Sequence, residues 1–404
     1  MQSLGWRPGL VQSTAATINR MKALPLRGEH LQEFRKALLW WYSVHARDLP
    51  WRRTRDPYKI WVSEIMLQQT RVSTMLGVYR SFVASYPSIP ALALAGEDEI
   101  LARWSGLGYY KRARSLHEAA RLLMRNHQGM MPQSFLELRK LPGVGDYTAA
   151  AVASIAFGEP VAVVDGNVER VITRLIGAAT INTKTRHRIQ DAAQKLLEPQ
   201  QAGTFNQAMM ELGAMVCSPR QPACDKCPVR EFCRTQGEHA PAAGPKTQRV
   251  AIAYQVLRRN KKNPPQILFI RRPADASQMP GMWELPLADP ALVHRQHPVW
   301  RTQHTITRTQ YAVSIYDAGV AGEEPQAEGR EIRWANGIDM QDLPLTGVTR
   351  KIMMHLRLMP RPLDGTADMQ PEDLLPEPRP VPYGPASPPH GRRRNVADED
   401  AAEG

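Results

Sequence analysis

Long apolar runs are missing from this sequence, because no stretch approaches the roughly 18 apolar residues needed to cross a bilayer. The first segment, MQSLGWRPGLVQSTAATINR, also lacks the continuous apolar core and the small-residue cleavage site of a secretory signal. Cysteine is scarce: all 4 cysteines fall within one short segment, and none is left over elsewhere. We therefore expect a cytoplasmic protein in a reducing compartment.

Negative charge is in deficit as well. The chain has 52 Lys and Arg against 39 Asp and Glu, a formal net charge of +13. This balance favours a polyanionic partner, with nucleic acid first and an acidic membrane surface second. The length of 404 residues suggests two domains with tails.

Strand-like alternation is scarce in the first half of the chain, where helical patterning predicts an all-α domain over residues 28–234. Residues 1–27 are expected to form a flexible lead-in, and residues 235–248 have the composition of a linker. The segments RVAIAYQVLRR, QILFIRR and TQYAVSIYDAG read as strands, and TGVTRKIMMHLRL reads as a closing helix. They predict an α+β domain over residues 249–358, followed by a disordered, proline-rich tail over residues 359–404.

One acid stands inside an apolar helical pattern. In WVSEIMLQQT, Glu64 is surrounded by residues that predict a helix buried on nearly every side. Carboxylates are rarely buried without a partner, because removing the charge from water is costly. Glu64 therefore needs an explanation beyond packing.

Two further motifs each allow two interpretations. In LPGVGDYTAAAVASIAFG, Gly143 and Gly145 can present backbone N–H groups to a phosphate at a helix start, or can simply form a corner between helices. In VAVVDGNVERVITRLIG, Asp165 with Asn167 can be an ordinary N-cap. Together with Glu64, however, Asp165 completes a pair of acids, and paired acids commonly break glycosidic bonds.

The cysteines form the strongest local signal. Cys217, Cys224, Cys227 and Cys233 have the spacing C-x6-C-x2-C-x5-C. Four close thiolates can hold a zinc ion or an iron–sulfur cluster. Zinc sites typically use two C-x2-C pairs, whereas a single pair with flanking gaps fits one compact 4Fe–4S loop better.

In this order, LPGVG, VDGNV and the cysteine spacing resemble the helix–hairpin–helix superfamily of DNA glycosylases that carry one 4Fe–4S cluster per chain. Within it, DLPWRR, WVSEIMLQQT, GLGYYKRAR and FNQAMMELGAMVC resemble the MutY-type adenine DNA glycosylases. PGMWELP is similar to the C-terminal, MutT-like domain that such enzymes append, so a Nudix-like fold is expected there. The resemblance implies base-excision repair of double-stranded DNA carrying A:8-oxoguanine or A:G mispairs, by a bacterial, nucleoid-associated monomer with no membrane partner.

The resemblance implies a role for each acid. Glu64 would protonate adenine at N7, Asp165 would stabilise the oxocarbenium-like sugar, and Tyr147 and Asn167 would support the pair. Bifunctional relatives such as endonuclease III place a Schiff-base lysine where this chain has Tyr147, and a phenol cannot form that imine. A glycosylase without strong lyase activity is therefore implied.

The same resemblance assigns residues to DNA. Those matching the adenine pocket are Arg47, Trp51, Arg52 and Gln207. Those matching the wedge that fills the gap left by the extruded base are Leu67, Gln69, Thr70, Leu107 and Tyr109. For Trp51 and Tyr109, aromatic packing in the core is the alternative.

The C-terminal domain lacks the G-x5-E-x7-R-E-x2-E-E-x-G run that binds magnesium in Nudix hydrolases, so nucleotide hydrolysis is not expected. The stretch HTITR replaces the Phe-Ser-His loop that recognises 8-oxoguanine in the family, leaving Thr307 and Arg308 as candidate lesion contacts. Two other functions remain open: an endonuclease III-like pyrimidine-lesion glycosylase/lyase and a non-catalytic iron–sulfur DNA-binding protein.

Overall fold

A computed structural model describes most of the chain. The described residues are 26–178, 182–237, 248–259, 265–306, 308–321 and 329–360. The predicted lead-in and tail fall almost entirely outside these ranges, as does most of the predicted linker. None of the described helices is long and apolar enough to cross a membrane.

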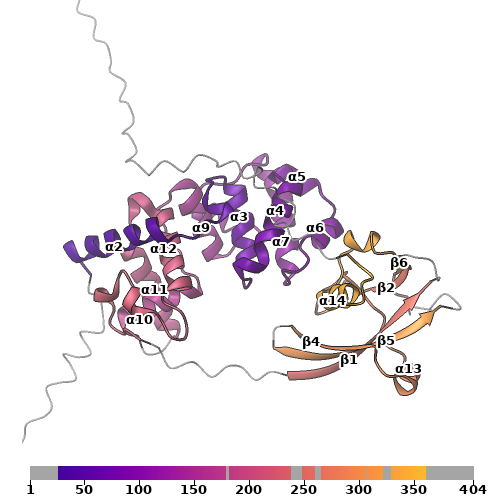
Figure 1. Ribbon diagram of the computed structural model, residues 1–404. Coiled ribbons are helices and arrows are strands. Elements are labelled where there is room, and N and C mark those ends of the chain that lie inside the picture. The colour runs from indigo at the N-terminus through magenta and orange to yellow at the C-terminus, as the bar shows by residue number, and fades with distance from the viewer. Residues whose placement is uncertain are drawn as a thin grey trace, which may run out of the picture. The chain divides into compact units, whose positions relative to one another are not determined.

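The first part of the described chain is helical, as predicted, and residues 26–237 contain no strand where they are described. Figure 1 shows these helices. The longer ones are α2 (Glu29–His45), α3 (Pro57–Leu67), α4 (Val72–Ser85), α7 (Lys111–His127), α9 (Asp146–Phe157), α10 (Gly166–Ile176), α11 (Thr183–Leu196) and α12 (Ala202–Met215). The short ones are α5 (Ile89–Leu94), α6 (Glu97–Arg103), α8 (Phe135–Leu138) and the 3₁₀ turns η1 (Pro50–Arg52), η2 (Pro199–Gln201), η3 (Cys224–Lys226) and η4 (Arg230–Phe232).

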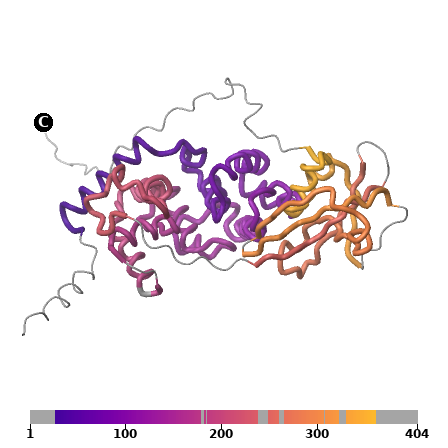
Figure 2. The backbone as a smooth tube through the Cα atoms, turned by 60° about the horizontal axis from the view of Figure 1, so that its bottom comes forward, coloured from indigo at the N-terminus to yellow at the C-terminus, as the bar shows by residue number. Residues whose placement is uncertain are grey.

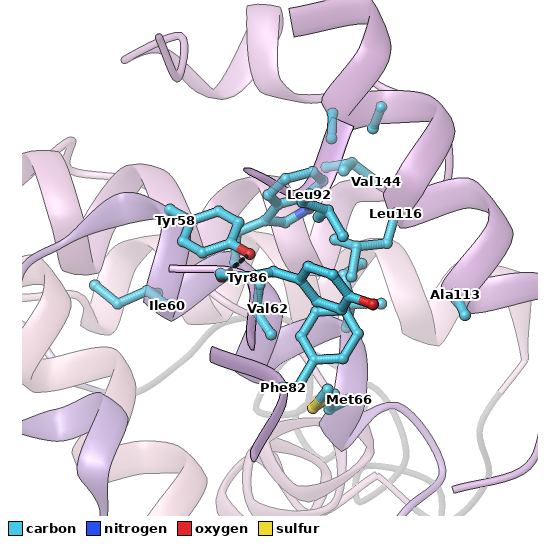
Figure 3. Packing of buried hydrophobic residues seen from close by; sticks show 14 of the residues in the cluster. Tyr58, Ile60, Val62, Met66, Phe82, Tyr86, Leu92, Ala113, Leu116 and Val144 are labelled. Carbon is cyan, nitrogen blue, oxygen red and sulfur yellow. Dashed lines mark hydrogen bonds between the residues drawn. The ribbon is translucent and has the colours of Figure 1, made fainter. Parts of the chain in front are cut away.

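Helix α3 is the most deeply buried of the site-bearing elements. Asp56 caps its start by accepting from the backbone N–H of Tyr58 at 2.9 Å, and Pro57 occupies the first helical position, where no N–H is needed. Its apolar residues pack against α4, α7 and α9, and the hydroxyl of Tyr58 donates to the carbonyl of Tyr86 (Figure 3). The predicted all-round burial of this helix is therefore found.

Two large hydrophobic cores and one small cluster, formed by Ala150, Ala151 and Val163, stabilise the described helical part. One large core is built around α3 and α4 and extends to the start of α9, while the other gathers α2, α10, α11 and α12. Helix α9 contacts α3 on one side and α12 on the other, and α12 in turn contacts α10. Residues from α3, α9 and α10 can therefore meet where the two cores adjoin.

The second part of the chain forms a six-stranded sheet (Figure 2). Its elements are β1 (Gln248–Arg258), β2 (Ile267–Arg271), β3 (Trp283–Glu284), α13 (Pro290–Arg295), β4 (Trp300–Ile306), β5 (Thr309–Val320), β6 (Ile332–Ala335), η5 (Asp339–Gln341) and α14 (Gly347–His355). The strand order is β3-β2-β1-β5-β4, with β6 paired to β2. Strands β1 and β5 run parallel, and the other pairs are antiparallel.

The expected α+β character of this part is confirmed by the sheet and by α14. Its predicted limits need small corrections, because β1 begins at Gln248, one residue early, and Met359 is buried in the sheet's core beyond the predicted end. The strands β3, β4 and β6 were not predicted. Thr307 lies outside the described residues, and its neighbours Ile306 and Arg308 belong to the β4–β5 hairpin.

Candidate active site and cysteine pocket

Glu64 lies on α3 with only 3% of its surface exposed. The hydroxyl of Tyr147 donates a hydrogen bond to its Oε2. The pKa of Glu64 is raised to about 7, mainly by burial and also by the negative charge of Asp165, against the opposing effects of the Tyr147 hydrogen bond and the charge of Arg52. Near neutral pH, Glu64 is therefore able both to hold a proton and to release it.

Asp165 is the N-cap of α10, so the capping interpretation is correct. Its Oδ1 accepts from the backbone N–H of Val168 at 2.7 Å, and its Oδ2 accepts from the side-chain amide of Asn167 at 2.8 Å. Burial raises the pKa of Asp165, and these donors oppose the rise by stabilising the carboxylate. Capping does not exclude the second role, because the charge of Asp165 acts on both Glu64 and Tyr147.

Tyr147 stands in the first turn of α9, directly after the Gly143–Gly145 turn. Gly143 has φ 74°, and a Cβ there would come within 2.6 Å of the Ser115 Cβ, so both backbone and space require glycine. Gly145 is the N-cap and supplies no side-chain hydrogen bond to the first N–H groups of the helix. Both glycines are exposed, which leaves this helix start accessible to an anion.

Asn167 is held by contacts that were not predicted from the sequence. A guanidinium nitrogen of Arg170 donates to Asn167 Oδ1 at 2.9 Å and to the Gly213 carbonyl at 2.7 Å. A Cβ on Gly213 would lie 2.6 Å from the Asn167 Cβ. Helix α12 thus approaches the Asp165 turn so closely that only glycine fits.

Arg47 and Arg52 converge on a buried acid, Glu211 of α12, which the sequence reasoning missed. Each guanidinium binds both carboxylate oxygens, Arg47 at 2.8 and 2.6 Å and Arg52 at 3.0 and 2.8 Å. These hydrogen bonds and charges outweigh burial and lower the pKa of Glu211 to about 2. Since Arg52 also acts on the charge of Glu64, the Arg47–Glu211–Arg52 cluster adjoins the acid pair.

The other two predicted adenine-pocket residues have structural partners. Trp51 is buried in the first core, where its ring packs edge-on against Tyr79 at 5.1 Å between centroids. The side-chain carbonyl of Gln207 accepts from the hydroxyl of Tyr42 at 2.9 Å. The packing interpretation of Trp51 therefore holds, and its contact with adenine stays a prediction.

The predicted wedge residues differ in exposure. Leu107 is buried at 5% exposure, and Leu67 and Thr70 are half-buried. Tyr109 is 46% exposed and Gln69 is also exposed. Both have left-handed backbones, with φ 48° at Tyr109 and φ 57° at Gln69, which is uncommon for residues other than glycine. Of the five, these two are the side chains free to enter a duplex.

The four cysteines are free thiols that line one pocket, together with Arg174. A guanidinium nitrogen of Arg174 donates to the Cys217 sulfur at 3.2 Å, and burial raises the pKa of Cys227 to about 11. Among the described residues, no group of three or more His, Cys, Asp or Glu side chains is drawn together tightly enough to hold a single metal ion. The donor set of four thiols with an adjacent cation nevertheless suits an anionic cluster.

The helical part of the chain is similar to a known family of proteins. Residues 62–211 match the family model described as HhH-GPD superfamily base excision DNA repair protein. The predicted helix–hairpin–helix glycosylase fold is thus supported for the helical part of the chain.

Within this class, the chain is similar to adenine DNA glycosylases. It is 47% identical to that of Homo sapiens over 50% of this chain and 39% of the human protein. It is 37% identical to that of Buchnera aphidicola subsp. Schizaphis graminum (strain Sg) over 50% of this chain and 58% of the relative. The solved structure of a thermostable thymine-DNA glycosylase matches at 31% identity, with a TM-score of 0.48 over 55% of this chain and 98% of that chain.

The resemblance to MutY-type enzymes is therefore confirmed, and the names of these relatives support the predicted enzyme class, a DNA glycosylase. The chain spans less than two thirds of the length of both adenine DNA glycosylases, 39% and 58% respectively. Substrate and residue roles therefore have to be argued from the site itself.

Proposed function

We propose that this chain is a monofunctional adenine DNA glycosylase that removes adenine mispaired with 8-oxoguanine or guanine. The observation that carries the proposal is the buried Glu64, whose pKa of about 7 suits a proton donor, close to the charge of a second acid, Asp165. A general acid is most effective when its pKa lies near the working pH. Adenine is a poor leaving group as an anion, so protonation is the step that most needs help.

The reaction begins with extrusion of the adenine nucleotide, which costs a few kcal/mol of stacking and pairing. Gln69 and Tyr109 fill the gap that the base leaves, and the exposed N–H groups behind Gly143 and Gly145 hold the phosphate backbone. The extruded base then enters the region between α3, α9 and α12, beside Arg47 and Arg52.

In the chemical step, Glu64 donates its proton to adenine N7. The N-glycosidic bond then breaks, and its electron pair goes to the base. Asp165, whose carboxylate is stabilised by Val168 and Asn167, faces the positive charge that develops on the sugar. Tyr147 orients Glu64 through its hydroxyl. Water then adds to C1′ of the sugar and gives up a proton to solvent, which leaves the abasic site. Because Tyr147 has no amine, no Schiff base forms.

A 4Fe–4S cluster fits the cysteine pocket. Cys217, Cys224, Cys227 and Cys233 would hold it, and the Arg174 guanidinium beside Cys217 would offset its negative charge. Each of the four thiolates would bind a different iron, so the ligands of such a cluster need not converge on one point as those of a single zinc ion do. When bound, the cluster would crosslink the loop that follows α12.

The sheet-forming part is proposed to be Nudix-like and to recognise the base opposite the adenine. Arg308, exposed in the β4–β5 hairpin, and Thr307 are its candidate contacts with 8-oxoguanine. We also propose that the protein acts as a monomer on double-stranded DNA in the bacterial cytoplasm.

The proposal is tested by single-turnover cleavage of duplexes with adenine opposite 8-oxoguanine, guanine or cytosine. We expect fast release of adenine from the first two and slow release from the third. Release of an oxidised pyrimidine, with borohydride trapping of the enzyme on DNA, would instead support the glycosylase/lyase alternative. Binding without any release would support a non-catalytic protein. Visible absorbance of the purified protein tests the cluster independently.

A further inference from the structure

Arg112, in the first turn of α7, connects two turns that are distant in sequence. One turn spans residues 68–70, directly after α3, and the other spans residues 106–109, directly before α7. One nitrogen at the tip of the guanidinium donates to the end of α3 and to the first turn, and the other donates to both turns. Helices α3 and α7 contact one another in the helical part of the chain (Figure 1).

One nitrogen, Nη1, completes the end of α3. It donates to the carbonyl of Ile65 at 3.0 Å, to that of Met66 at 2.9 Å and to that of Gln68. The last carbonyls of a helix have no partner within the helix, and a cation there is also favoured by the helix dipole. Because Arg112 satisfies these groups, α3 stops abruptly and the chain can turn outward through Gln69 at φ 57°.

The other nitrogen, Nη2, holds the 106–109 turn. It donates to the carbonyls of Leu107 at 3.0 Å and Gly108 at 3.1 Å, and to the hydroxyl of Thr70 at 3.1 Å. This turn has left-handed backbone at Gly106, Gly108 and Tyr109, with φ 95°, 66° and 48°. Such a turn needs outside support, because Tyr109 has little intrinsic preference for this conformation.

The guanidinium of Arg112 also lies against the rings of Trp104 and Tyr109, at the two ends of the segment that contains the 106–109 turn. Its central carbon is 5.5 Å from the Trp104 ring centroid and 5.6 Å from that of Tyr109. Burial lowers the pKa of Arg112 to about 10, so the group stays charged at neutral pH. Within the described part of the chain, its partners are carbonyl and hydroxyl oxygens and aromatic faces, and no carboxylate neutralises it.

We propose that Arg112 is a positioning residue that sets the separation and direction of Gln69 and Tyr109 as they enter the duplex. The inference rests on the proposed function and adds to it a residue that need not touch DNA. The planar fork of arginine serves both turns at once, because Nη1 donates to the end of α3 and Nη2 bridges Thr70 and the 106–109 turn, whereas the single ammonium of lysine cannot do both. Misplacement of about 1 Å far from the reacting atoms can cost on the order of 10²-fold in rate.

The experiment compares Arg112→Lys with Arg35→Lys. Arg35 is the control, since its guanidinium likewise donates to carbonyls at a helix end, those of Leu196 at 2.9 Å and Lys195 at 3.4 Å, beside the second core. Arg35 differs from Arg112 in that it also pairs with Glu198 at 3.5 Å, a contact that lysine can keep. Each variant is made in the active protein and in the Glu64→Gln background, which is expected to bind without cleaving. The probe is an A:8-oxoguanine duplex with 2-aminopurine beside the target adenine, whose fluorescence reports unstacking.

Arg112→Lys is expected to slow both the fluorescence rise and single-turnover excision by on the order of 10- to 100-fold. Arg35→Lys is expected to lower the melting temperature by a similar amount to Arg112→Lys, with both rates within about twofold of the parent. Equal rates in Arg112→Lys and the parent, or equal slowing in the two variants, would overturn the inference. If the parent itself releases no adenine, the proposed function fails, and unstacking in the Glu64→Gln background still tests Arg112.

Discussion

Two buried glutamates on apolar helices, Glu64 on α3 and Glu211 on α12, have opposite properties. Their exposures are 3% and 0%, so burial raises the pKa of both. Glu64 has a neutral phenol as its hydrogen-bond partner and a pKa of about 7. Glu211 has two arginines in forked contact and a pKa of about 2.

The difference shows that burial alone does not assign a role to a carboxylate. An acid buried beside a hydroxyl can exchange a proton near neutral pH, and one buried between guanidinium groups remains an anion that organises them. Under the proposed function, the first would perform chemistry and the second would hold Arg47 and Arg52 in place. Four changes would break or sharpen this comparison.

Glu64→Gln should have the largest effect. We expect single-turnover excision of adenine to fall by about 10³-fold or more, because the amide keeps the shape and can still pair with Tyr147 but cannot give up a proton. The melting temperature should not fall, since no buried charge loses a partner. Excision within tenfold of the parent would show that Glu64 is a structural acid after all.

Glu211→Gln should mainly cost stability. Removing the anion leaves Arg47 and Arg52 facing each other without compensation, and we expect a loss of about 3 kcal/mol in the free energy of unfolding. Urea denaturation followed by circular dichroism measures it. Excision should fall less than in Glu64→Gln. If Glu211→Gln and Glu64→Gln were equally stable, Glu211 would not be an anion that organises the two arginines.

The two acids should also give opposite pH dependences. Glu64 has a folded-state pKa of about 7, above its ordinary 4.5, so its contribution to stability is complete below pH 4.5 and is lost as the pH rises through 7. Glu211 has a folded-state pKa of about 2, so its contribution is present above pH 4.5 and is lost as the pH falls toward 2. Unfolding curves of the parent and each glutamine variant across this range isolate the two contributions.

Excision should follow the protonated form of Glu64 and decline roughly tenfold per pH unit above about 7. Tyr147→Phe removes a hydrogen bond that lowers the pKa of Glu64, so the decline should begin at higher pH. An unchanged profile in Tyr147→Phe would mean that another group controls the rate.

Gly213→Ala should have the smallest effect. It tests whether the close approach of α12 holds Asn167, and through it Asp165, in place. The added methyl would meet the Asn167 Cβ at 2.6 Å and disturb the amide that holds Asp165, so we expect excision to fall by about tenfold and stability by about 1–3 kcal/mol. Gly77→Ala on α4 is the control, because a Cβ there meets no atom within 4 Å. It should leave excision unchanged and stabilise by up to about 1 kcal/mol.

The elements with strong periodicity could be predicted from the sequence. Helix α3 and strands β1, β2 and β5 were found close to their expected limits. Strand β4 was missed because its residues alternate between exposed and half-buried at the sheet edge, which leaves no apolar run. Strand β6 was missed because Ile332–Ala335 is too short to show a period.

The candidate site was only partly predictable, for a similar reason. Glu64 stands out against its apolar neighbours, and Glu211 in FNQAMMELGAMVC stands out in the same way, but the sequence does not show that two arginines pair with Glu211. Pairings such as Arg47 and Arg52 with Glu211, or Arg112 with Ile65, join residues far apart in sequence. No local pattern encodes them, because they depend on how the helices pack.

Helix α3 carries Glu64 and ends at Leu67, immediately before the turn that presents Gln69. Three residues of helix, at about 1.5 Å of rise each, separate Glu64 from the end of α3, and Gln69 follows two residues later in the turn. Under the proposed function, Glu64 and Gln69 therefore approach the DNA together. Undamaged DNA that resists entry of Gln69 would then not bring a base to Glu64. Detection of the mispair and catalysis would therefore depend on the same helix.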